Sequence, residues 1–177
     1  MNFIRVFDNG VMPAIVVTLK ERHGMDEVQL GYLGSLVFIG EATGSFLAMP
    51  IYSSRRIPIK AILLTSILLQ GAVFLSTALS GGNFEVMAVS RFLTGLFQVF
   101  LRIYAPIWCD TYAPQKSKTT WLMLIFLTQT VGNTVGYMVT AFIISVGGSW
   151  PISFYVEIGA LCPVAYYIIA VAETRFL

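Results

Sequence analysis

Charged residues are scarce in this sequence. Asp, Glu, Lys and Arg together make up 11% of its 177 residues, whereas hydrophobic residues make up 56%. An ordinary soluble domain is about a quarter charged. A soluble domain of this size would have to expose apolar residues over much of its surface. The composition therefore excludes an ordinary soluble domain and indicates a protein whose solvent is lipid.

Residues suited to catalysis or metal binding are also few. The two cysteines, Cys109 and Cys162, lie far apart within apolar runs, which is not the spacing of a metal site or a disulfide framework. The single histidine, His23, lies in a charged segment, and we find no nucleophile–base pair. The net charge of +2 gives no sign of a nucleic-acid partner. We predict that the protein is not an enzyme and has no metal or cofactor.

Long apolar runs are what the sequence does contain. A helix needs about 20 apolar residues to cross a hydrocarbon core of about 30 Å. Six runs reach or approach this length, turn-forming residues separate them, and the alternation typical of a membrane barrel is missing. The first run carries Arg5 and Asp8 and lacks a cleavage site, so we interpret it as a retained helix. We predict one all-α domain over residues 1–177, with helices at about 1–19, 28–52, 58–79, 84–110, 119–146 and 150–172.

The basic residues between these runs predict an orientation. Arg55, Arg56, Lys60, Lys116, Lys118 and Arg175 follow the even-numbered runs, whereas only Lys20 and Arg22 follow an odd-numbered one. Basic residues accumulate on the cytoplasmic side of membrane proteins. We therefore expect both termini in the cytoplasm.

Six ionisable residues lie inside the predicted spans: Arg5, Asp8, Glu41, Arg91, Arg102 and Glu157. A charge at mid-membrane costs a few kcal/mol or more, so it usually faces protein or water and has a partner. Arg5 and Asp8, at i and i+3, can pair locally. Each residue alone fits a structural interhelix pair, but the whole set favours a polar cavity.

Two glycine pairs have the GxxxG spacing that lets helix backbones approach closely. They are Gly40 with Gly44 and Gly132 with Gly136. Close approach of this kind supplies packing between membrane helices, where the hydrophobic effect does not drive association. We expect both pairs to lie at helix crossings.

Several stretches resemble the major facilitator superfamily, and within it the spinster-like group. Ser90 to Gly95 is similar to the Arg-x-x-x-Gly motif of the fourth helix, and Tyr104 to Asp110 to its alanine-proline run and acidic end. Gly132 to Tyr137 is similar to the fifth-helix glycine pair, and Gly10 to Pro13 to a first-helix Gly-Val-Leu-Pro.

The resemblance implies the fold and some of the site. The superfamily fold has two six-helix halves, each a 3+3 inverted repeat, with substrate held between the halves. This chain corresponds to the N-terminal half, so we expect a second half to be missing and its partner face to need covering. The fourth-helix glutamate of spinster-like proteins corresponds to Gln98, and their first-helix aspartate to Ile4, with Asp8 one turn away.

The resemblance also implies a cytoplasmic latch between the second and fourth helices. Arg56 and Lys60 fit the basic positions of the superfamily's loop signature, whose acidic position falls on Arg55. Related transporters pair the position of Arg56 with that of Asp110, so we expect these two side chains to approach each other. Gly95 takes the place of a helix-packing glycine.

Two functional hypotheses follow. The first is a secondary transporter, or half of one, that moves an organic or lipid-like solute by alternating access, with proton coupling. Its substrate-binding or coupling candidates are Asp8, Glu41, Arg91, Gln98, Arg102 and Glu157. The second is a non-transporting membrane protein that acts as an assembly or regulatory partner. Spinster-like relatives imply an endolysosomal or other membrane and leave the plasma membrane open. We expect the isolated chain not to transport as a monomer.

The topology is testable by cysteine labelling in intact cells. With cysteine introduced at Gly24 and at Ser117, a membrane-impermeant reagent should label the first and not the second, because the basic residues place only Gly24 outside. Labelling of Ser117 alone would reverse the assignment.

Overall fold

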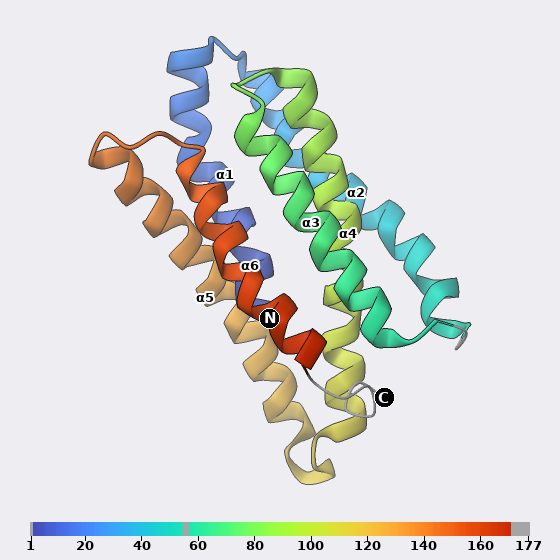
Figure 1. The fold of residues 1–177 in the computed structure, drawn as a ribbon. Coiled ribbons are helices and arrows are strands. Elements are labelled where there is room, and N and C mark those ends of the chain that lie inside the picture. Colours follow the sequence, from blue (N-terminus) through green and yellow to red (C-terminus); the bar gives the residue numbers. More distant parts are fainter. Residues whose placement is uncertain (1, 55–56, 171–177) are drawn as a thin grey trace.

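The chain forms an all-helical bundle. The computed structural model describes residues 2–54 and 57–170, with side chains from residue 6 onward. Its helices are α1 (Asn2–His23), α2 (Glu27–Ser53), α3 (Ile59–Leu79), α4 (Phe84–Tyr112), α5 (Lys118–Ser145) and α6 (Ile152–Ala170), and a short 3-10 turn, η1 (Gln115–Ser117), precedes α5. Successive helices run in opposite directions (Figure 1). By length and composition, α2 to α6 are each able to span a bilayer.

Local signals explain where the helices begin and turn. At α2, the Asp26 side chain accepts from the backbone of the first turn while Gln29 reaches back to the Asp26 amide (3.1 Å), which forms a capping box. At α4, the Asn83 side chain accepts from the amide of Glu85 (3.0 Å). The α1 helix continues to His23, four residues beyond its predicted end, because Lys20, Glu21 and Arg22 favour helix.

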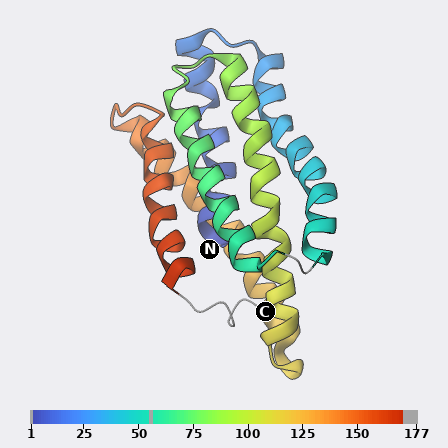
Figure 2. The ribbon, with the colours of Figure 1, turned by 45° about the vertical axis from the view of Figure 1, so that its right-hand side comes forward.

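The helices are arranged in two groups of three. Helix α1 packs chiefly on α5, and α2 chiefly on α4, while α3 packs on both α4 and α6. Figure 1 shows α1, α5 and α6 on one side and α2, α3 and α4 on the other, and Figure 2 shows the bundle from a second direction. If α1, α2 and α3 correspond to α4, α5 and α6, the contact of α1 with α5 corresponds to the contact of α4 with α2. This is the relation that a 3+3 repeat requires.

Glycines set the spacing at both of these crossings. A Cβ added at Gly40 would overlap the carbonyl oxygen of Phe92, and one added at Gly95 would overlap that of Val37. The α1–α5 crossing repeats the arrangement, with Gly10 against Asn133 and Gly136 against Phe7. Gly132 is buried on the same α5 face. The glycines therefore allow backbone-to-backbone contact, as their sequence spacing predicts.

The exterior of the bundle is apolar. Large side chains such as Phe46 (79% exposed) and Phe142 (69% exposed) point outward, whereas the interior holds Phe74 and Phe154, whose ring centroids are 6.3 Å apart. In water such a surface would be unstable, but in lipid it is the expected one. The structure is that of a multi-pass membrane protein.

The glycine crossings yield a paired test. We expect Gly95→Ala to destabilise the protein by about 1–3 kcal/mol, because the new methyl group forces α2 and α4 apart. Gly71→Ala in α3 is the matched control: a Cβ there meets nothing within 4 Å, so the change should be neutral or stabilising by up to about 1 kcal/mol. Denaturant titration in detergent, followed by circular dichroism, measures both. Equal stability of the two variants would contradict the crossing.

Candidate functional site

A buried ion pair joins the two groups of helices. Arg91 of α4 donates from Nη1 to both carboxylate oxygens of Asp8 in α1, each at 2.8 Å. The side chains are 2% and 0% exposed. The sequence allows Asp8 to pair locally with Arg5, whose side chain lies outside the described part; the partner that the structure shows is Arg91. The reason is that Asp8 faces the bundle interior, where α4 supplies a buried cation that needs a carboxylate.

A second polar cluster links α2 and α4. Gln98 donates from Nε2 to one carboxylate oxygen of Glu41 (2.7 Å), and Arg102 donates from Nη1 to the other. Gln98 and Arg102 are four residues apart and therefore lie on one helix face. The Arg102 side chain is 38% exposed, so this pair, unlike the first, is accessible.

The last acidic candidate, Glu157 of α6, is buried beside the first pair. Its side chain is 1% exposed, and Asp8 and Arg91 lie within electrostatic range of it. One turn before it, the Phe154 ring lies under the Arg91 guanidinium, with 5.5 Å between the guanidinium carbon and the ring centroid. The structure thus brings Asp8, Arg91 and Glu157 together, and separately Glu41, Gln98 and Arg102.

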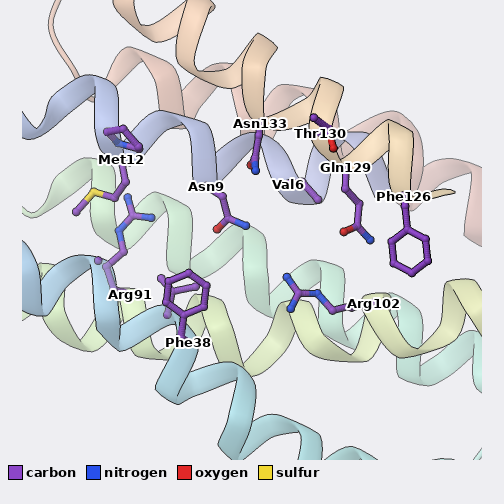
Figure 3. Close-up of a pocket in the computed structure, with 13 residues that line it drawn as sticks. Val6, Asn9, Met12, Phe38, Arg91, Arg102, Phe126, Gln129, Thr130 and Asn133 are labelled. Carbon is purple, nitrogen blue, oxygen red and sulfur yellow. The ribbon is translucent and has the colours of Figure 1, made fainter. Parts of the chain in front are cut away.

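A cavity of about 610 Å³ lies between α1, α2, α4 and α5. Both arginines line it (Figure 3). Its other labelled side chains are Val6, Asn9, Met12, Phe38, Phe126, Gln129, Thr130 and Asn133. The volume is that of a small-molecule site, and a few polar groups among apolar ones are typical of such sites. Of the ionisable residues inside the predicted spans, only the two arginines of α4 are among the described residues that line this cavity; Asp8, Glu41 and Glu157 do not line it.

The neutral residues of this cavity were not identified from the sequence. Gln129 and Asn133 are four residues apart on α5, and Asn9 lies beside them on the adjacent α1, pointing to the same side (Figure 3). The available signal was this polar stripe on an otherwise apolar helix. Of the amide side chains, only Gln98 was a candidate from the sequence, because the family resemblance marks its position.

The structure shows partners for two of the three residues of the predicted cytoplasmic latch, Asp110 and Lys60. Asp110 at the end of α4 forms an ion pair with Lys118, the first residue of α5, because the short η1 turn brings these helix ends together. Lys60 donates to the carbonyl oxygen of Ile169 in α6 (2.9 Å). Arg56 lies outside the described residues, so its approach to Asp110 stays a prediction.

The buried Asp8–Arg91 pair and the exposed Lys20–Glu27 pair should contribute differently to the stability of the protein. We expect Arg91→Gln to destabilise the protein by about 3–5 kcal/mol, because it leaves Asp8 buried without its cation. Lys20→Gln is the matched control: Lys20 pairs with Glu27 at 2.7 Å, and both side chains are more than half exposed. That change should have little effect on stability, because solvent screens an exposed pair. Denaturant titration of both variants checks the difference, and an equal small cost would mean that the buried pair is dispensable.

Comparisons with known proteins agree with this architecture. The family model described as Major Facilitator Superfamily matches residues 1–174. The 4-hydroxybenzoate transporter PcaK of Pseudomonas aeruginosa is 28% identical over 146 residues, which are 82% of this chain and 32% of that protein. PcaK of Pseudomonas putida is 27% identical over the same shares. The chain thus spans about a third of the length of these relatives. It belongs to the Major Facilitator Superfamily.

Proposed function

We propose that the chain forms one six-helix half of a secondary transporter that moves an organic anion carrying an aromatic ring. The observation that carries this proposal is the cavity of about 610 Å³ with Arg102 at its wall. The Arg102 side chain is 38% exposed, so part of its guanidinium is open to a solute. A partly exposed guanidinium is suited to bind a carboxylate.

The remaining walls of the cavity suit an aromatic body with a polar substituent. Phe38 and Phe126 line it from α2 and α5, and Asn9, Gln129 and Asn133 add amides. Aromatic rings stack on an aromatic solute, and amides bind a hydroxyl group. The two relatives are named as transporters of 4-hydroxybenzoate, which has a carboxylate, a ring and a hydroxyl group. This agreement supports an aromatic acid as the solute.

The spinster-like resemblance supports a different solute, a lipid-like amphiphile. Its anionic head group would use the same arginine, and its chain would need a continuous apolar path. The aromatic and amide groups gathered in one cavity favour the compact acid. The remaining alternative, a non-transporting assembly or regulatory partner, would need no solute at the cavity, so binding discriminates among all three.

Transport by this proposal also requires a second six-helix unit. The cavity side of the bundle carries Arg102, Gln129, Thr130 and Asn133, all at least partly exposed. Polar side chains in a membrane face water or protein rather than lipid. We infer that a second half, in the same or another chain, covers this face, and that the solute is exposed to either side as the halves rock. The ends of α3 and α4 that carry Lys60 and Asp110 would then lie on the cytoplasmic side.

Binding of matched ligands to the chain in lipid nanodiscs tests the proposed solute. We expect 4-hydroxybenzoate to bind at least about tenfold more tightly than the neutral 4-hydroxybenzamide, because the charge-assisted bond to Arg102 contributes about 1.5–3 kcal/mol. In Arg102→Gln this preference should disappear. Isothermal titration calorimetry measures both affinities.

Lys116→Gln is the control, since Lys116 is an exposed cation in η1, away from the cavity; it should keep the preference. Equal binding of the acid and the amide to the unmodified chain would contradict the carboxylate site. Displacement of the acid by lysophospholipid at lower concentration would favour the lipid-like solute instead.

A further inference from the structure

A second cavity lies on the outer surface of the bundle, between α3 and α4. Its volume is about 600 Å³, and its described lining comes from these two helices alone. It is an open groove, since Val89 on its rim is 60% exposed whereas Val73 is 7% exposed. None of its described lining residues also lines the solute cavity. The groove is therefore a separate site, and in a membrane it faces lipid.

Small side chains on α3 and larger ones on α4 make the groove. Ala72 and Ser76 are four residues apart on α3 and therefore lie on one helix face. The buried Ser90 of α4 donates from Oγ to the Oγ atom of Ser76 (3.5 Å), which links the two helices across the groove. The α4 wall is formed by apolar side chains at helical spacing, namely Val86, Val89, Leu93 and Phe97. Such walls suit a hydrocarbon chain.

The groove has the depth of one leaflet of a bilayer. Glu85 and Phe97, at its two ends, are twelve residues apart on α4 and thus about 18 Å apart along the helix axis. Half of a hydrocarbon core of about 30 Å is about 15 Å. The α3–α4 turn, next to Glu85, lies at the same end of the bundle as the α1–α2 loop (Figures 1 and 2). The groove therefore runs from one membrane surface to about the midplane, as an acyl chain does.

An acidic side chain lies at the surface end of the groove. Glu85 is exposed in the first turn of α4, and it forms no ion pair with another described residue. The helix dipole by itself favours a carboxylate at this position. Glu85 becomes informative because it lies where the head group of a lipid in the groove would be. A carboxylate there attracts an ammonium group and repels a head group of net negative charge.

We propose that the groove binds one phospholipid, with an acyl chain between α3 and α4 and a zwitterionic, ammonium-bearing head group at Glu85. Lipid tails are as apolar as the groove walls, so the hydrophobic effect does not select among lipids. The shape of the groove selects an acyl chain, and the charge of Glu85 selects the head group.

The depth of the groove favours a lipid over a protein partner. A transmembrane helix seated on this surface would need a groove across the full hydrocarbon core of about 30 Å, whereas the described groove extends over about 18 Å of α4. Because the groove is separate from the solute cavity, this inference does not depend on the proposed transport function.

Photo-crosslinking of the 177-residue chain in a non-ionic detergent tests the site. The probe is phosphatidylethanolamine with a photoreactive diazirine on one acyl chain, and mass spectrometry of the digested protein locates the label. We expect the label within residues 69–76 of α3 and 86–97 of α4. Unlabelled phosphatidylethanolamine should compete at least about threefold better than phosphatidylglycerol with the same acyl chains, because Glu85 repels the second head group.

Two variants separate the head-group contact from the groove itself. Glu85→Gln should remove the preference between the two competitors and leave the groove labelled. Ala72→Phe places a ring in the groove and should abolish the label there. Ala42→Phe is the matched control, since Ala42 is exposed on α2 and lines neither of the two described cavities; it should keep the label. Circular dichroism checks that each variant is folded.

Three results would overturn the proposal. The first is a label spread evenly over the outward faces of α3 to α6, and the second is equal competition by the two lipids in the unmodified chain, which needs no variant to be folded. The third is a groove that is still labelled in folded Ala72→Phe. An unlabelled groove in a chain that light scattering shows to be a dimer would assign this surface to a second copy instead.

Discussion

The burial of Arg91 is the constraint on which the arrangement of this bundle depends. A guanidinium that is 2% exposed inside a membrane protein needs a carboxylate, and Asp8 supplies it from another helix. The pair explains how α1 is held within the bundle, since α1 is not among the helices apolar enough to be membrane spans by composition. Asp8, which lowers the hydropathy of α1, is also the residue that ties α1 to α4.

Close backbone packing and this ion pair act at different places. The glycine crossings hold α1 on α5 and α2 on α4, within each group of three helices. The Asp8–Arg91 pair instead runs from α1 to α4 and so connects the two groups. Glycines at a crossing allow two helix backbones to touch but do not select the partner helix. The ion pair forms only when α1 is rotated so that Asp8 faces Arg91. The glycines therefore set the distance between packed helices, and the ion pair sets the rotation of α1.

The fold was predictable from the sequence to a greater degree than the site. Apolar length predicts the helices, and the GxxxG spacing predicts that Gly40 and Gly136 lie at crossings, because both signals are local. The Asp8–Arg91 pair was not predictable, since the two residues are far apart in the sequence and only the rotation of α1 turns Asp8 toward α4. The cavity residues Asn9 and Gln129 depend on how three helices face one another, which no single helix pattern records.

The two arginines of α4 have different environments, and this difference separates two tasks. Arg102 is 38% exposed and lines the cavity, so a solute carboxylate can compete there with Glu41 without entering a dry site. At Arg91 any exchange of partner would leave the buried Asp8 carboxylate without a cation, so this pair acts as a fixed contact. The two residues lie eleven positions apart on one rigid helix, about 16 Å along its axis. A tilt of α4 would therefore move both arginines together, so the contact of α4 with α1 cannot change without a change in its contact with α2.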